Sequence, residues 1–129
     1  MNAIIGLLEL TLRRDRLHEE DKTSLSIAHG SARDLLSLIG DILDISKIES
    51  GRLELRPEPH EITALTASVV TVFTALARQK NLQLDLAAGE PRWVQIDGIC
   101  YKQILSNLIS NAIKYTEQGS VRVELQSKT

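Results

Sequence analysis

The chain has 129 residues, of which 43% are hydrophobic and 25% charged, a balance typical of a globular rather than a disordered protein. A net charge of −2 without a basic patch argues against nucleic acid as a partner. The single Cys100 excludes an internal disulfide framework and suits a reducing cytoplasm. Since we see no apolar run near the roughly 20 residues of a membrane span, we expect a cytoplasmic segment without membrane contact.

Two amphipathic helices are predicted in the N-terminal part of the chain. Residues 2–16 carry a wide apolar stripe, and arginines favour the C-terminal end of this helix. A charged connection at 17–21 has the length that joins antiparallel helices. Residues 22–50 place apolar side chains at steps of three and four, and Gly51 is a natural C-cap. This pattern predicts an antiparallel helical hairpin.

The two predicted helices differ in length. At about 1.5 Å per residue, the first spans roughly 22 Å and the second roughly 43 Å. The first helix therefore covers the second only to about Leu36, and the apolar stretch 36–48 has no partner within the chain. An uncovered stripe of this kind is an association surface or an aggregation hazard. We expect a homodimer that covers it, as half of a dimeric four-helix bundle, and a first helix that originally began before Met1.

A second module is predicted after Pro57 and Pro59, which mark a boundary and end a possible short strand at 53–56. Periodicity predicts a helix at 61–80, strands at 82–86 and 93–96, a helix capped by Asp97 and Gly98 that runs to about residue 116, and a strand at 121–125. The inward residues expected in the helix at 61–80 are Ile62, Leu65, Val69, Val70, Phe73, Leu76 and Ala77. The chain is therefore expected to be α+β, with modules at 1–52 and 53–129.

The stretch QILSNLISNAIKYT, from Gln103 to Thr116, carries the most informative pattern. Apolar residues recur at helical spacing and form one face of the predicted helix: Leu105, Leu108, Ile109, Ala112 and Ile113. The opposite face carries Gln103, Asn107, Asn111 and Lys114. Asparagine is a poor helix former, whereas an amide oxygen can enter a magnesium shell and lysine suits phosphate. The residues alone leave two interpretations open, a solvated polar face or a ligand-binding one.

Other chemistry has little support in the sequence. His18, His29 and His60 are far apart and lack cysteine partners for a metal. Cys100 has no histidine placed to activate it, so a buried or inert thiol is expected. We find no glycine-rich phosphate loop. The asparagine face is therefore the main candidate site.

Several segments together resemble sensor histidine kinases. NLISNAIKYT resembles the N box of that family, within the fold shared by the GHKL ATPases, and QIDGICYKQIL resembles its usual lead-in. DILDISKIESGRLEL is similar to the end of the second helix of the dimerisation and histidine-phosphotransfer domain. MNAIIGLLELTL looks like the part of the first helix directly after the H box. The resemblance covers nearly the whole chain in order, and hybrid, multi-step phosphorelay sensors look closest.

The resemblance implies ATP and Mg²⁺ as cofactors and a truncated GHKL-type α/β ATP-binding sandwich at 53–129. Asn111 would coordinate the magnesium, and Asn107 would be a second polar contact near the phosphates. Lys114 would approach the phosphates. Tyr115 would border the nucleotide site or, alternatively, pack at the end of its helix. The sequence departs from the family at Cys100 and Tyr101, where arginine and leucine are common, which leaves the packing of the lead-in open.

The resemblance also implies parts that lie outside these residues. The phosphoacceptor histidine would precede Met1, and the glycine boxes and lid would follow Thr129, so no catalytic residue is expected in the chain. His18, His29 and His60 are expected to be solvated surface histidines.

The parent would autophosphorylate from ATP and pass the phosphoryl group to a response-regulator receiver domain, either as a soluble protein or anchored in the inner membrane. The chain alone is expected to be inactive. The alternative is a non-catalytic dimerisation module.

Overall fold

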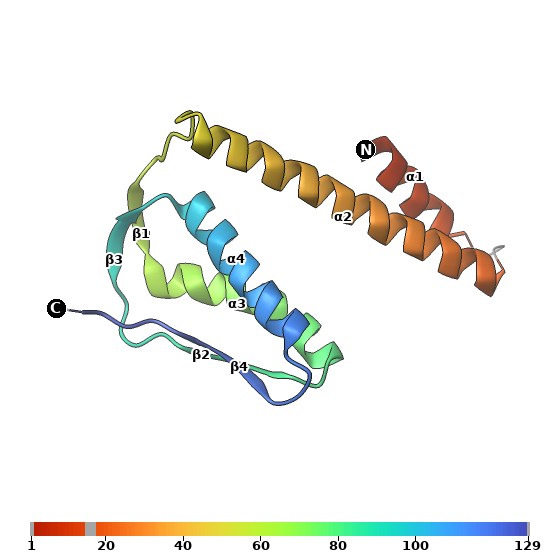
Figure 1. Cartoon of the computed structure of the whole chain (residues 1–129). Coiled ribbons are helices and arrows are strands. Elements are labelled where there is room, and N and C mark those ends of the chain that lie inside the picture. The colour runs from red at the N-terminus through yellow and green to blue at the C-terminus, as the bar shows by residue number, and fades with distance from the viewer. Residues whose placement is uncertain (1, 15–17, 129) are drawn as a thin grey trace. The chain divides into compact units, whose positions relative to one another are not determined.

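The computed structural model describes residues 2–14 and 18–128, and the chain divides into two compact units, Met1–Glu54 and Leu55–Thr129. The first unit contains helices α1 (Asn2–Leu12) and α2 (Glu19–Glu49). The second contains, in chain order, β1 (Glu58–Glu61), α3 (Ile62–Gln79), β2 (Gln83–Ala87), β3 (Trp93–Ile96), α4 (Gly98–Tyr115) and β4 (Ser120–Glu124) (Figure 1). The predicted α+β class, with a helical hairpin followed by an α/β part, is confirmed.

The hairpin of α1 and α2 has different limits from those predicted. The first helix ends at Leu12 and turns at Arg13 instead of continuing to residue 16; residues 15 and 16 lie outside the described part. The second helix begins at Glu19, so most of the expected connection is helical. Its first turn carries Glu19, Glu20 and Asp21, and negative charge there is stabilised by the helix dipole. The charged segment is thus a helix start rather than a linker.

A polar cluster connects the two helices of the hairpin. Oε1 of Glu9 on α1 lies 3.0 Å from Nε2 of His29 and 3.6 Å from Nη2 of Arg33, both on α2. The side chain of His29 is only 19% exposed. The expectation of a solvated surface histidine is therefore wrong at His29, because the hairpin brings a carboxylate from the other helix onto its ring.

The apolar stripe of α2 is uncovered from Leu35 to Ile48, close to the predicted stretch 36–48. Ala32 is half-buried, but large apolar side chains are exposed from the next turn onward. These are Leu35, Leu36, Leu38, Ile39, Ile42, Leu43, Ile45 and Ile48, between 37% and 60% exposed. Since α1 has 11 residues and α2 has 31, a partner helix within this unit covers only the first part of α2.

The link between the units differs from the predicted short strand. Helix α2 closes with Gly51 at φ +69°, the left-handed position expected of a C-terminal glycine, and its N–H donates to the Ile48 carbonyl at 3.1 Å. Residues 53–56 are not a strand, and Leu53 and Leu55 are exposed. The strand lies later, in β1, and contains Pro59. An edge strand tolerates proline because its outward N–H has no ladder partner.

The second unit contains two small sheets with two helices packed on them. Strands β1 and β3 pair antiparallel, with Pro59 opposite Gln95, and β2 and β4 pair in parallel, with Leu84 opposite Val121. Figure 1 shows α3 and α4 side by side along these strands. The buried core is aliphatic, as the scarcity of aromatics predicts: Val69, Val70, Ala77, Leu82, Ile109, Ile113 and Val121.

Helix α3 has the predicted position and a partly different buried face. Val69, Val70 and Ala77 are buried as predicted, whereas Leu76 is 42% exposed, because it lies beside the buried stripe rather than within it. Thr66 is completely buried, although it was not among the predicted inward residues because its side chain is polar.

Alone among the described helices, α3 is long and apolar enough, by length and composition, to cross a membrane. The sequence analysis did not anticipate this. Four of its residues are buried in the unit, and the helix packs against α4 and β2. Packing in the core accounts for the apolar residues on its buried side, whereas Val72 and Leu76 are exposed.

A partly buried hydrogen bond joins α3 to α4. Oγ1 of Thr66 donates to the Ile62 carbonyl at 2.7 Å, and the Tyr101 hydroxyl lies 2.7 Å from the same oxygen. Since threonine has one hydroxyl proton, Tyr101 is the donor to Thr66. The tyrosine that departs from the family pattern therefore packs the start of α4 onto α3.

We predict that Thr66→Val lowers the free energy of unfolding by about 1–2 kcal/mol, because the Tyr101 hydroxyl is left without its acceptor. Thr71→Val is the matched control. Thr71 makes the same type of bond, to the Ala67 carbonyl at 2.8 Å, on an exposed part of the same helix, and its loss should change stability by less than about 0.5 kcal/mol. Urea denaturation measures both, and equal effects would contradict the prediction.

Candidate functional site

The N-terminal end of α4 is fixed by the carboxylate of Asp97, as predicted. Its Oδ1 accepts the N–H groups of Ile99 at 3.1 Å and Cys100 at 3.0 Å, and its Oδ2 accepts the N–H of Arg56 at 2.9 Å. The hydrogen bond from Arg56, followed by that from Cys100, holds the pKa of Asp97 below its ordinary value. The cap is therefore ionised at neutral pH, and it also holds the segment before β1 against the helix start.

The N-terminal end of α3 has a similar cap. The Glu61 carboxylate accepts the N–H groups of Thr63 and Ala64, each at 2.9 Å, and of Arg92 at 3.2 Å. Desolvation raises the pKa of Glu61, but the hydrogen bonds from Ala64, Thr63 and Arg92 outweigh it and lower the pKa. Both helices thus begin at a carboxylate that also binds another segment of the unit.

His60 belongs to the packing around the start of α4. It lies in β1 and is half-buried. A Cβ at Gly98 would lie 2.8 Å from its Nε2, so glycine is needed for the imidazole to pack there. The expectation of a solvated His60 in the link is wrong, because the strand extends through Pro59 and places the ring against the helix.

The four predicted site residues all lie on the exposed side of α4. Ile109 and Ile113 are buried in the core, and the exposed positions are Asn107, Asn111, Lys114 and Tyr115. The predicted apolar face was too broad, since Leu108 is 63% exposed. At about 100° per residue, Leu108 lies nearer to Asn111 than to the buried isoleucines.

The outward side of α4 therefore combines apolar and polar side chains. Ile104, Leu108 and Tyr115 are exposed apolar residues that lie alongside Asn107, Asn111 and Lys114 at helical spacing. We call these six residues the α4 face. Nζ of Lys114 lies 5.3 Å from the centre of the Tyr115 ring, within the range of a cation–π interaction. Tyr115 is 73% exposed, so its ring contacts Lys114 at the surface.

A residue that the sequence did not single out holds the C-terminal end of α4. Lys80, at the end of α3, donates from Nζ to the carbonyls of Ile113 at 2.7 Å, Lys114 at 3.0 Å and Thr116 at 3.1 Å. The partners lie more than thirty positions away in sequence. No local pattern could have revealed this contact.

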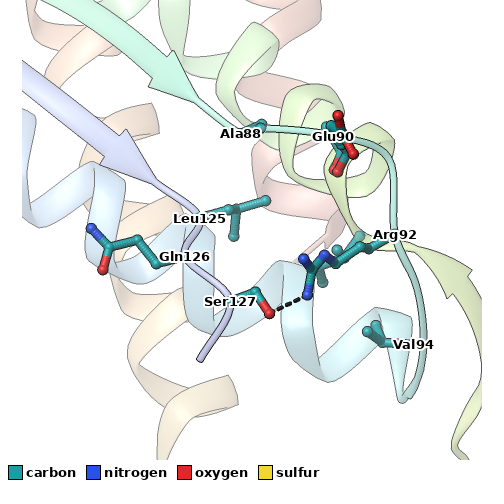
Figure 2. A pocket seen from close by; sticks show the side chains of 10 residues that line it. Ala88, Glu90, Arg92, Val94, Leu125, Gln126 and Ser127 are labelled. Atoms are coloured by element: carbon teal, nitrogen blue, oxygen red, sulfur yellow. Dashed lines mark hydrogen bonds between the residues drawn. The ribbon is translucent and has the colours of Figure 1, made fainter. Parts of the chain in front are cut away.

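Three hollows of this unit lie away from the α4 face. Figure 2 shows one of about 330 Å³, where the Arg92 guanidinium donates to the Ser127 hydroxyl. A second is lined by His60, Asp97 and Lys102, among others, and a third lies between α3 and α4. None of the three is lined by a residue of the α4 face. The predicted site residues thus form an open surface rather than part of these hollows.

The α4 face could contribute only part of a metal site. Within residues 2–14 and 18–128, no group of three or more His, Cys, Asp or Glu side chains is placed to hold a metal ion. The amide oxygen of Asn111 suits magnesium, which prefers oxygen ligands and near-octahedral coordination. A magnesium ion at Asn111 therefore needs most of its ligands from a bound molecule and water.

Comparison with known proteins finds a family model that matches the N-terminal part of the chain and relatives that are similar over most of its length. Residues 1–51 match the His Kinase A (phospho-acceptor) domain. The virulence sensor protein BvgS of Bordetella bronchiseptica is 49% identical over 125 residues, which cover 94% of this chain and 10% of that protein. The chain thus spans about a tenth of the length of this relative.

Solved structures also resemble the chain. The crystal structure of full-length ShkA in complex with AMPPNP has a TM-score of 0.78 and 27% identity, and the match covers 98% of this chain and 27% of that one. The histidine kinase ThkA in complex with the response regulator protein TrrA has a TM-score of 0.63 and 22% identity, with 95% of this chain and 37% of that one covered. The latter likeness concerns the fold alone.

Proposed function

Because the chain belongs to the sensor histidine kinases, we propose that Leu55–Thr129 forms part of a GHKL-type ATP-binding domain. The parent protein would transfer the γ-phosphoryl group of ATP to a histidine and then to a response-regulator receiver domain. ShkA was solved with AMPPNP, an ATP analogue, and ThkA with a response regulator. The ShkA complex supports the cofactor proposed for this chain, and ThkA, which resembles the chain in fold alone, is a kinase solved with a partner of the proposed kind.

The observation that carries the proposal is the α4 face itself. Asn107, Asn111 and Lys114 are exposed on a helix whose other side is fixed in the core. Exposed asparagines weaken a helix without stabilising the fold. Their presence on the outward side is accounted for by a ligand that binds there.

The chemistry of the face suits a magnesium nucleotide. The amide of Asn111 would supply one oxygen to Mg²⁺, and Lys114 would supply positive charge to the phosphates. Asn107 would donate a hydrogen bond near them. Leu108 and Tyr115 offer an apolar border for the nucleotide. Bound Mg²⁺ would neutralise phosphate charge, and the residues of the chain would orient the triphosphate.

The chain alone is proposed to bind nucleotide weakly and not to autophosphorylate. The α4 face alone does not enclose a nucleotide, and His29 and His60 each pack against another part of their own unit. Nε2 of His29 lies against Glu9, and the ring of His60 packs on Gly98. A phosphoacceptor needs a free ring nitrogen that can reach the γ-phosphorus in line. Both residues are half-buried, which restricts the approach of a γ-phosphorus to their rings.

We predict that Asn111→Ala reduces the affinity for a fluorescent ATP analogue about tenfold in the presence of Mg²⁺, because one metal ligand is lost. With EDTA present, wild type and variant should bind equally weakly. Alanine is the better helix former, so unfolding would not explain the loss.

Lys102→Ala is the matched control for this titration. It removes a charge from the exposed surface of the same helix, away from the α4 face, and should retain the wild-type affinity. Absence of binding to the wild type would favour the non-catalytic dimerisation module. Equal binding by wild type and Asn111→Ala would contradict the magnesium role of Asn111.

The uncovered stripe of α2 is proposed to form the homodimer. Eight large apolar side chains are exposed within residues 35–48, and soluble monomers rarely expose a contiguous apolar patch of this kind. A second copy of the hairpin would bury the stripe and complete a four-helix bundle. Both hypotheses, the kinase and the non-catalytic dimerisation module, include this dimer, so dimerisation does not distinguish between them.

We predict that Ile42→Glu raises the dimer dissociation constant at least about tenfold, because a buried, unpaired carboxylate is costly. Ser37→Glu is the matched control, since Ser37 lies on the opposite side of α2 at about 100° per residue. Sedimentation equilibrium over a concentration series measures both. A wild type that remains monomeric, or a Ser37→Glu effect of the same size, would contradict the proposed interface.

A further inference from the structure

The C-terminal end of α4 depends on one side chain from α3. The ammonium of Lys80 has three N–H donors, and it lies 2.7, 3.0 and 3.1 Å from the carbonyl oxygens of Ile113, Lys114 and Thr116. All three donors therefore have an acceptor at the C-terminal end of α4, two in its last turn and one at the cap residue Thr116. The side chain acts as a cap that another helix supplies.

Lys80 is itself held in place by the end of α3. Its N–H donates to the Ala77 carbonyl at 3.1 Å, and the N–H of Asn81 donates to the Arg78 carbonyl at 3.0 Å. Asn81 has φ +55°, the left-handed position that ends the helix. The chain then enters β2, which pairs with β4. The cap thus extends from a fixed helix end rather than from a mobile loop.

The contact bears directly on the α4 face. The last carbonyls of a helix lack intrahelical partners and carry its negative end. Two residues of the α4 face, Lys114 and Tyr115, lie in this last turn. Without the ammonium of Lys80, this end of α4 would lose three charge-assisted hydrogen bonds, and Lys114 would be left to offset the negative helix end.

We infer that Lys80 is a positioning residue for nucleotide binding. It fixes the last turn of α4 and neutralises the helix end, so that Lys114 and Tyr115 meet a triphosphate in one arrangement. Lys80 acts through α4 and is not assigned a contact with the nucleotide. This inference rests on the proposed ATP site.

The test compares the affinity of wild type, Lys80→Met and Lys80→Arg for a fluorescent ATP analogue with Mg²⁺. Lys80→Met should weaken binding about five- to tenfold, since it removes the charge and all three donors. Lys80→Arg keeps both and should lie within about threefold of wild type. The titrations are made well below the unfolding temperature of each variant, so that the constants refer to folded protein.

Arg78→Met is the matched control. Arg78 lies in the last turn of α3 and is exposed, so its loss removes the same charge from the same helix end without touching the cap. It should bind nucleotide as wild type does. An equal loss in Arg78→Met would assign the effect to general electrostatics and overturn the inference.

The remaining outcomes separate this inference from the proposed function. Unchanged affinity in Lys80→Met, with or without a lower unfolding temperature, overturns the positioning role while Asn111→Ala still tests the ATP site. A wild type that binds no nucleotide overturns both. Weakened binding in Lys80→Met, recovery in Lys80→Arg and unchanged binding in Arg78→Met support the role of Lys80.

Discussion

The burial of one side of α4 is the constraint on which the rest of the second unit depends. Ile109 and Ile113 pack with Val69, Val70 and Ala77 in a single aliphatic core. This packing leaves the helix only one side to present to solvent, and the asparagines lie there. The orientation of the side chains that could bind a ligand is thus set by apolar core residues, which themselves cannot bind it.

Polar contacts then fix the helix along its axis. Asp97 caps the start of α4, and Tyr101, near that start, donates a hydrogen bond to Thr66 on α3. Lys80 donates hydrogen bonds to carbonyls at the C-terminal end of α4. These contacts come from three different segments of the sequence, and in each of them the donor and the acceptor are paired. Hydrophobic packing is non-directional, so these hydrogen bonds define the position of the α4 face more closely than the core can.

In the first unit, the main constraint is the difference in length between α1 and α2. A short α1 cannot cover a long α2, and the uncovered part of α2 exposes eight large apolar side chains between Leu35 and Ile48. Such a surface is stable in water only when something covers it. Within the hairpin, the carboxylate of Glu9 between His29 and Arg33 adds a polar contact at one level of the two helices.

Sequence periodicity and capping rules were sufficient for most elements. They placed α3 and α4 within one residue at each end, identified Asp97 as a cap and put the site residues on the exposed side of α4. They failed where contacts between distant segments decide the outcome. The burial of Thr66, the Glu9 partner of His29 and the cap from Lys80 all depend on residues twenty or more positions away. Residues 53–56 alternate like a strand but have exposed leucines, whereas β1 finds its partner in β3 despite Pro59.

The central claim is that the α4 face binds a magnesium nucleotide. The most direct measurement follows the backbone amide signals of the ¹⁵N-labelled chain by NMR during titration with Mg²⁺ and a non-hydrolysable ATP analogue. We expect the largest shifts between Asn107 and Thr116, with smaller shifts around Arg92 and Ser127. Shifts concentrated in the hollow of Figure 2, or no shifts at millimolar nucleotide, would contradict the claim.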